Sequence, residues 1–306
     1  MKKIAWSLSG SAFYLRGQAY AAYKADKDYN KKPSVIYGSS GGAVVGLFYA
    51  VLGADRMKEV ADVVNLADAH KWRAMGKNGK MSLRSMMSIA FGGFPVKQDL
   101  TEIIKRFISK NDFQGWKLDD SRTGMFVLCV DVVTGERCFY DLKRAPYSIM
   151  IKLLNATCAM QGMCAPVKFN GRNLWDGGQL DHQPIAGLPA ADWMNLQGAE
   201  LVTFYSRGET PNGSNENSDW DLMPFDTKKA GYLQWLNRMI EIDNYEKSLN
   251  DEQLIDTRCH THGVKQYKIT INRVLKNFYD NDKDRQYSQA LEGFKAAERT
   301  FKTNNN

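Results

Sequence analysis

The sequence holds few of the residues and patterns that mark disulfide-rich, membrane-spanning or repetitive proteins. Its 306 residues include five cysteines, an odd number with no close pairing motif, so we interpret them as reduced core residues of a cytosolic protein. No apolar run is long enough to cross a bilayer, and no internal repeat is present. Residues 1–8 are too short and too interrupted by serine for a signal peptide. We therefore expect a cytoplasmic protein without a transmembrane segment.

Patterns for metal and nucleic-acid binding are also missing. Residues 259–262 crowd one cysteine and two histidines into four positions without a second cluster of ligands, which is typical of a polar loop. We predict no metal and no cofactor. The net charge of +7 favours an anionic partner. Nucleic acid is not expected in that role, because no zinc-finger, RNA-recognition or basic-zipper pattern occurs.

What the chain does have is enough length and apolar content for one large domain. Its residues are 43% hydrophobic, and strand-like segments alternate with helical ones. We expect strands at 4–8, 34–37, 125–130, 137–142, near Leu174, at 201–206 and at 264–271, and helices at 15–25, 43–52, 56–67, 100–109, 147–160, 228–256 and 287–301. This alternation predicts an α/β layer architecture in a single domain over residues 1–306.

Residues 38–42 fit the Gly-x-Ser-x-Gly pattern of a nucleophile elbow. They stand between a short β-branched strand and a helix that is apolar nearly all round. Ser40 would be the nucleophile, and Gly38, Gly41 and Gly42 would allow the sharp turn from strand to helix. The alternative is a glycine-rich turn of another α/β protein that binds a phosphate at the helix N-terminus.

A second segment places a lone carboxylate, Asp176, at the end of a predicted strand, directly before Gly177 and Gly178. Together with Ser40 and residues 6–11, this segment resembles the patatin-like phospholipase family. That family pairs the elbow serine with the aspartate of an Asp-Gly-Gly motif and uses no histidine. The resemblance implies a serine acyl hydrolase of the phospholipase A or lysophospholipase type, with Ser40 as nucleophile and Asp176 as general base.

The resemblance is clearest over residues 4–206 and extends to residues 126–136, 156–159 and 165–167. It implies a three-layer α/β fold with a central, mostly parallel sheet and helices on both faces, with residues 207–306 as a C-terminal extension of the same domain. One segment departs from the family. The usual Gly-Gly-Gly-x-Arg-Gly loop is replaced at residues 9–17 by a longer stretch with fewer glycines.

Acyl transfer also needs N–H donors aimed at the oxyanion. The elbow geometry assigns the amide of Gly41 to this role. The other candidates are the amides of Gly10, Ser11 and Ala12, because the loop after the first strand lies at the carboxyl edge of the sheet, where ligands bind in α/β proteins. An aspartate has a reference pKa of about 3.9, so Asp176 must be partly desolvated or act through tight geometry.

Two other interpretations stay open. An α/β-hydrolase-type esterase would need a histidine such as His260 or His262, although only one strand and one helix precede Ser40, too few for that fold. A non-catalytic member of the patatin fold would bind lipid or a protein partner, which the irregular loop at residues 9–17 makes plausible.

Residues 71–97 interleave cations with methionine and aromatic side chains, and glycines bracket a Met-rich helix. The composition suits a mobile cap whose apolar face rests on acyl chains while Lys77, Lys80 and Arg84 meet headgroups. A core-covering helix with a solvated basic face is the alternative. We predict a phospholipid or other acyl-lipid substrate and transient, peripheral contact with an anionic membrane surface.

Overall fold

The computed structural model describes residues 3–10, 15–64, 70–72, 93–94, 96–206, 247, 249–272 and 282–304. Within them, eight strands form a central sheet in the order β10-β9-β1-β2-β5-β8-β7, with β6 paired to β5. These strands are β1 (Ile4–Leu8), β2 (Val35–Gly38), β5 (Gly124–Asp131), β6 (Arg137–Asp141), β7 (Val167–Phe169), β8 (Arg172–Asp176), β9 (Glu200–Tyr205) and β10 (Lys265–Thr270). A separate antiparallel pair joins β3 (His70–Trp72) to β4 (Val96–Gln98).

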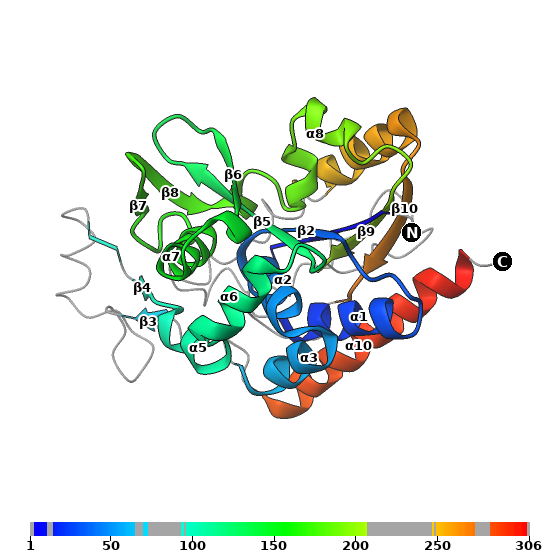
Figure 1. The fold of residues 1–306 in the computed structure, drawn as a ribbon, viewed down its shortest axis with the longest axis horizontal. Coiled ribbons are helices and arrows are strands. Elements are labelled where there is room, and N and C mark those ends of the chain that lie inside the picture. Colours follow the sequence, from blue (N-terminus) through cyan, green and yellow to red (C-terminus); the bar gives the residue numbers. More distant parts are fainter. Residues whose placement is uncertain are drawn as a thin grey trace, which may run out of the picture.

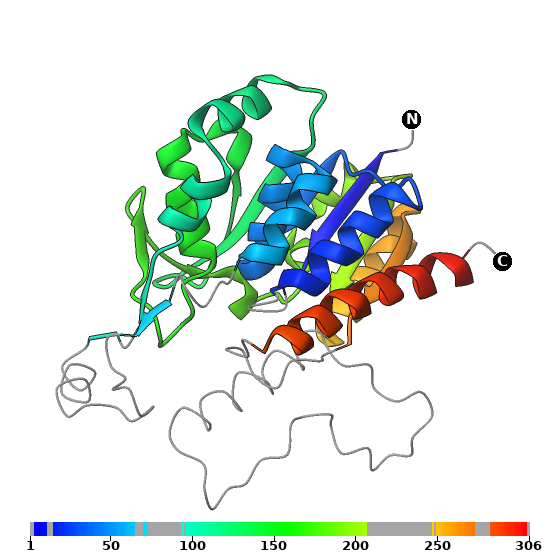
Figure 2. The ribbon, with the colours of Figure 1, turned by 90° about the horizontal axis from the view of Figure 1, so that it is seen from below.

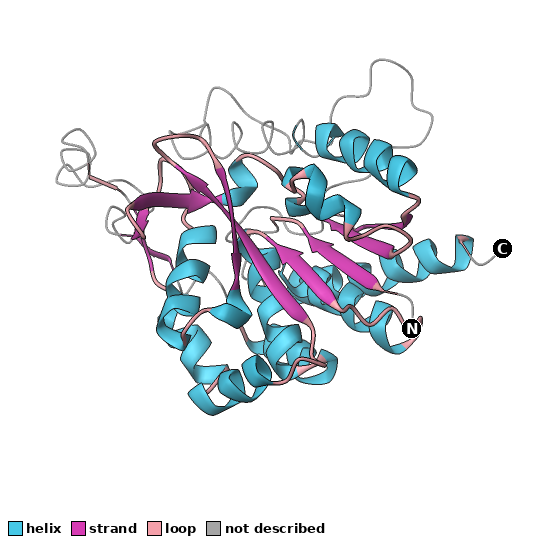
Figure 3. Cartoon of the chain, turned by 45° about the horizontal axis from the view of Figure 1, so that its top comes forward, coloured by secondary structure: helices cyan, strands magenta, loops and turns pink. Residues whose placement is uncertain are grey.

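Five neighbouring strands, from β10 to β5, run parallel, whereas β6 and β8 are antiparallel to β5 and β7 is antiparallel to β8. Helices cover both faces of this layer (Figures 1 and 3). Helices α1, α2, α3 and α10 lie on one face, and α8 and the helical residues 249–262 lie on the other. The predicted α/β fold with a mostly parallel central sheet is therefore confirmed.

The named helices follow in chain order. They are α1 (Leu15–Lys27), α2 (Ser40–Leu52), α3 (Ala54–Val63), α5 (Thr101–Phe107), α6 (Lys110–Leu118), α7 (Tyr147–Thr157), α8 (Ala190–Met194) and α10 (Lys283–Thr303). Figure 2 shows α10 lying along α1, so the end of the chain packs on the helix that follows the first strand.

Several expected boundaries are wrong. Helix α2 begins at Ser40, three residues before its predicted start, and α7 ends at Thr157, three before its predicted end. The prediction missed α6 and α8, although a capping box of Ser109 and Asp112 marks the start of α6. Of the helix predicted at 228–256, residues 228–246 and 248 lie outside the described residues, and the described helical residues continue to residue 262.

The alternation of side chains along β1 builds a core on each face of the sheet. Trp6 and Leu8 pack into the larger core beneath α1, α2 and α10. Ala5, between them, packs into a second core with Trp193 of α8 and Ile255 of the helix at 249–262. All five cysteines are buried and free of disulfides, as the sequence predicted.

The register of the paired strands determines where the loops that follow β1, β2 and β8 lie relative to one another. Leu8 pairs with Gly38, and Gly38 pairs in turn with Val127 of β5, so β1 and β2 end side by side. On the same edge of β5, Asp176 of β8 pairs with Cys129, two residues further along β5 than Val127, while β6 pairs with the opposite edge. Because β2 and the antiparallel β8 share one edge of β5, their ends point toward each other, and the residues that follow Gly38 come close to Asp176.

Helix α2 approaches the end of β1 closely at one residue, Gly42. A Cβ atom there would collide with the backbone oxygens of Leu8 and Ser9. Backbone carbonyls at the end of a buried strand cannot move aside as a flexible side chain can. The turn before α2 can therefore pack against β1 only if this position is a glycine.

This contact predicts that Gly42→Ala lowers the free energy of unfolding by about 2 to 4 kcal/mol through overpacking. The matched control is Gly115→Ala in α6, where an added Cβ meets nothing within 4 Å. That substitution should raise stability by up to about 1 kcal/mol through helix propensity. Chemical denaturation of the two variants measures both changes. Equal stability of the two would contradict the close-approach argument.

Candidate active site

The turn between β2 and α2 holds Ser40 in a strained backbone conformation. Ser39 is extended, and Ser40, the first residue of α2, has φ of 51°. A non-glycine residue in this left-handed region costs about 1 to 3 kcal/mol, and such strain gathers at functional sites. Gly38 makes room for the turn, since a Cβ there would lie 2.7 Å from the Cα of Ala43. The geometry is that of a nucleophile elbow.

A buried threonine fastens this elbow to the neighbouring strand. The amide of Ser40 donates to Oγ1 of Thr157 at 3.1 Å. The same hydroxyl donates to the carbonyl oxygen of Leu128 in β5 at 2.6 Å. Thr157 is the last residue of α7 and is fully buried. Its hydroxyl therefore satisfies one of the N–H groups that a helix N-terminus leaves without an intrahelical partner.

Asp176 ends β8 and lies within hydrogen-bonding reach of Ser40. Its side chain is 4% exposed, and its Oδ1 accepts the amide of Gly178 at 2.8 Å. Burial raises the pKa of the Asp176 carboxyl to about 7, while hydrogen bonds from the Ser40 hydroxyl and the Gly178 amide, and the charge of Lys247, act to lower that pKa. The carboxyl group can thus exchange a proton near neutral pH.

The glycines after Asp176 allow the chain to turn sharply away from β5. A Cβ at Gly177 would collide with the carbonyl oxygen of Leu128, and one at Gly178 would lie 3.2 Å from Oδ1 of Asp176. Four of the motif glycines, Gly38, Gly42, Gly177 and Gly178, are therefore positions where backbone passes close to backbone or to the carboxylate.

The candidate oxyanion donors differ in their availability. Within the described residues, the amides of Gly41 and Gly42 at the start of α2 donate to no protein acceptor. The amide of Gly10, by contrast, donates to the carbonyl oxygen of His182 at 3.1 Å. Gly10 still lies beside Ser40, since a Cβ at Gly10 would be 3.7 Å from the Cβ of Ser40. Ser11 and Ala12 lie outside the described residues.

Arg16 and the histidines occupy structural positions. Arg16 donates to the carbonyl oxygens of Ala61 and Asp62 and so ties α1 to the end of α3. His262 stacks on Trp193, with ring centroids 6.2 Å apart, on the face of the sheet that α8 covers. His260 is exposed on the same helix.

Sequence reasoning missed the residues that hold the loop after Asp176. Arg137 pairs with Asp181 through two hydrogen bonds, of 2.5 and 2.9 Å, and Asp251 accepts the amide of Gln183 at 2.8 Å. Asp251 is 68 residues from Gln183, so no local pattern could link the two. Thr157 lies in a segment that the sequence marked only for its small residues.

A comparison with models of protein families identifies residues 10–188 as a patatin-like phospholipase region, which is more than half of the chain. The chain belongs to the patatin-like phospholipase family. Members of this family are lipid acyl hydrolases, so the resemblance that the sequence predicted is confirmed. The matched region contains Ser40, Asp176 and the Thr157 that anchors the elbow.

Among solved structures, VipD from Legionella pneumophila is similar to this patatin-like chain. The similarity has a TM-score of 0.53 and 11% sequence identity, and it covers 99% of this chain and 67% of the VipD chain. At that identity the similarity concerns the fold alone. A comparison with curated protein sequences found no match. Among the described residues of the patatin-like chain, no helix combines the length and apolar character that a bilayer crossing requires.

The hydroxyl of Thr157 yields a first prediction for the site. Thr157→Val keeps the shape but leaves the Ser40 amide and the Leu128 carbonyl without their buried partner, which should lower stability by about 1 to 3 kcal/mol. It should also slow labelling of Ser40 by a fluorophosphonate. Thr157→Ser keeps the hydroxyl and is the matched control. Equal labelling rates for the valine and serine variants would show that the hydroxyl does not anchor the elbow.

The buried carboxyl of Asp176 yields a second prediction. Because its pKa rises from 3.8 to about 7 on folding, the folded state holds a proton that the unfolded state releases. Stability of the wild type, relative to Asp176→Asn, should therefore fall as the pH rises from about 4 to 7, by up to roughly 4 kcal/mol. Melting temperatures of both proteins across this range measure the difference. A gap between them that does not change with pH would contradict the raised pKa.

Proposed function

We propose that this protein is a serine acyl hydrolase of the phospholipase A or lysophospholipase type, which cleaves lipid acyl esters through an acyl-Ser40 intermediate. The observation that carries the proposal is that Ser40, on a strained elbow, lies beside the buried carboxyl of Asp176. Membership of a family of lipid acyl hydrolases supports the same chemistry and suggests acyl lipids as the substrate class.

In the proposed first step, the Ser40 hydroxyl attacks the ester carbonyl carbon and its proton passes to Asp176. A new C–O bond forms, and the carbonyl oxygen becomes an oxyanion. We assign the amide of Gly41, in the first turn of α2, as a donor to that oxyanion. Gly10, Ser11 and Ala12 are the proposed further donors, and Gly10 would have to give up its bond to His182 to contribute.

The second half of the reaction reverses these proton transfers. Protonated Asp176 returns the proton to the leaving alcohol as the ester C–O bond breaks, which leaves the acyl-enzyme. Water then attacks the acyl carbon, Asp176 takes the proton of that water, and Ser40 recovers its hydroxyl hydrogen when the fatty acid leaves. A carboxyl group with a pKa near 7 serves both directions, because neither protonation state is strongly favoured at neutral pH.

The remaining assignments are part of the proposal. We propose that residues 207–306 complete the catalytic domain, since β10 extends the sheet and α10 packs on α1. The protein would be cytoplasmic and touch anionic membranes transiently. The surface assigned to that contact, with Lys77, Lys80 and Arg84, lies outside the described residues and stays a prediction from the sequence.

Two substitutions test the acyl-enzyme directly on a p-nitrophenyl ester. Ser40→Ala and Asp176→Asn should each lower kcat by about 10⁴-fold or more, because nucleophile and base act as a unit. In Ser40→Ala, labelling by a fluorophosphonate should be abolished. Circular dichroism checks that both variants are folded.

The control is a variant in which His182, His260 and His262 are all replaced by glutamine. It should keep most of the wild-type activity if Asp176 is the base. A folded but inactive histidine variant would favour an α/β-hydrolase-type triad instead. A wild-type protein that neither turns over esters nor reacts with the probe would favour a non-catalytic lipid- or protein-binding member of the fold.

A further inference from the structure

Asp251 is a carboxylate on the buried face of a helix. In the helical residues 249–262, Asp251, Ile255 and Cys259 follow one another at intervals of four and are all buried. Ile255 and Cys259 belong to the core on that face of the sheet. An unpaired carboxylate in such a row would be strongly unfavourable, so the position of Asp251 has to be explained by the partners it finds there.

Those partners are backbone amides of the loop that follows Asp176. Oδ2 of Asp251 accepts the amide of Gln183 at 2.8 Å, and the amide of the preceding residue, His182, lies close enough to act on the pKa of the carboxyl. Burial raises the pKa of Asp251 to about 7, and the nearby charge of Asp181 acts in the same direction. The two amides and the charge of Arg137 lower that pKa, so hydrogen bonding offsets part of the desolvation.

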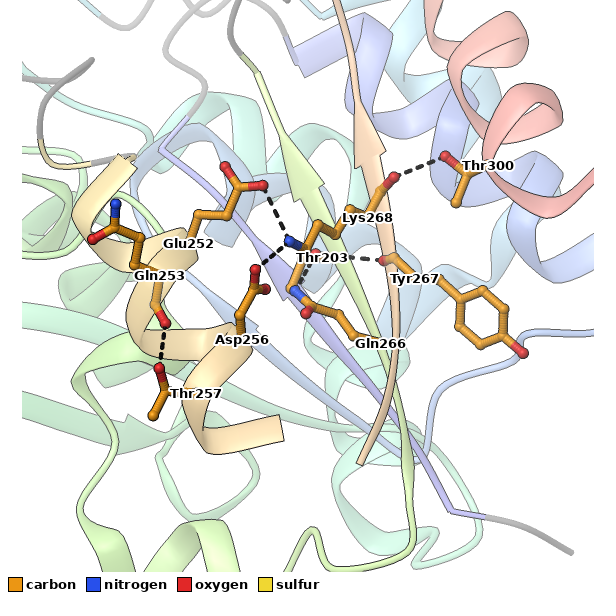
Figure 4. A network of polar contacts seen from close by, with 9 residues as sticks. All are labelled: Thr203, Glu252, Gln253, Asp256, Thr257, Gln266, Tyr267, Lys268 and Thr300. Atoms are coloured by element: carbon orange, nitrogen blue, oxygen red, sulfur yellow. Dashed lines mark hydrogen bonds and ion pairs between the residues drawn. The ribbon is translucent and has the colours of Figure 1, made fainter. Parts of the chain in front are cut away.

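The opposite side of the same helix is fixed to the edge of the sheet. Figure 4 shows Nζ of Lys268, on β10, between Glu252 and Asp256, at 3.2 and 2.6 Å from their carboxylate oxygens. Lys268 is in turn linked through its backbone oxygen to Thr300 of α10. The helix that carries Asp251 is thus held to β10 on one side while Asp251 reaches the loop on the other.

The loop held by Asp251 connects the two halves of the candidate site. It begins at Asp176, and its residue His182 receives the amide of Gly10 through its carbonyl oxygen. Further on, Gln183 accepts the hydroxyl of Ser7 at 2.7 Å and donates to the carbonyl oxygen of Phe204 at 2.8 Å. A shift of this loop would therefore displace the general base and the loop after β1 together.

We propose that Asp251, from a helix outside the region matched to the family, is a positioning residue: it clamps the loop of residues 176–183 and thereby sets the geometry of Asp176 and Gly10. The inference rests on the proposed function in one respect: loss of the clamp can lower kcat only if the loop carries the general base. Its structural half, the restraint of the loop by Asp251, does not depend on catalysis.

The test compares Asp251→Asn with Asp256→Asn in the full-length protein. Both remove one carboxylate from the same helix, but Asp256 faces Lys268 and not the loop. Two readouts are taken: hydrogen exchange of peptides covering residues 177–183, followed by mass spectrometry, and kcat and KM on a soluble p-nitrophenyl ester.

In Asp251→Asn, the loop amides should exchange about tenfold faster or more, because the side chain loses its negative charge and one of its two acceptor oxygens, which weakens its hydrogen bonding to the loop. The kcat should fall about tenfold or more while KM stays within about threefold, as expected for a misplaced base. In Asp256→Asn, loop exchange and kcat should match the wild type. If Asp251→Asn does not fold, Asp251→Ser is measured by the same criteria.

Unchanged loop exchange in the Asp251 variant would overturn the clamp, whatever the enzyme does. Equal losses in the Asp251 and Asp256 variants would also overturn it, because the effect would then belong to docking of the helix. If the wild type proves inactive on esters and unreactive towards fluorophosphonate, yet Asp251→Asn still loosens the loop, the proposed function fails and the clamp stands.

Discussion

The approach of Ser40 to Asp176 is the contact on which the rest of the site depends, and it is made where two strands meet end to end along one edge of β5. Strand β2, which leads to Ser40, pairs with that edge as far as Val127. Strand β8 runs in the opposite direction, pairs with the same edge, and ends at Asp176 opposite Cys129, while β6 pairs with the other edge. The register of both strand pairs, and the hydrogen bond from Thr157 to Leu128, therefore determine how closely the two strand ends approach each other.

The site combines two unfavourable features that the surrounding structure has to offset. Ser40 holds a left-handed backbone conformation, and Asp176 is a carboxyl group with almost no contact with water. Both are tolerated because buried partners satisfy them: the Thr157 hydroxyl for the Ser40 amide, and the Gly178 amide for the carboxylate. The polar groups beneath the site are hydrogen-bonded into the ends of β1 and β9, which gives these two residues a rigid base.

The sequence was sufficient for the parts of the fold that follow from local pattern. Strand β1 falls at its predicted bounds, and the elbow lies where a strand meets an apolar helix. The start of α2 was misplaced because glycines are poor helix formers, whereas here Gly41 and Gly42 are helical so that the chain can pass close to β1. The clamp by Asp251 and the engagement of Gly10 by His182 depend on contacts between distant segments, which no spacing in the sequence reveals.

The direction of β8 bears on how this chain can vary in length. Because β8 runs opposite to β5, the chain enters the site from the edge where the parallel strands end, stops at Asp176, and turns away at Gly177 toward β1. Between Asp176 and Gln183 it has only a short span, fastened at each end and at Asp181 between them. An inserted residue in this span would displace either Asp176 or His182, whose carbonyl oxygen accepts the amide of Gly10. The two residues that turn the hairpin between β7 and β8, Asn170 and Gly171, are exposed, and a Cβ at Gly171 would meet nothing within 4 Å. Natural length variation should therefore collect in that turn and be excluded from the span after Asp176.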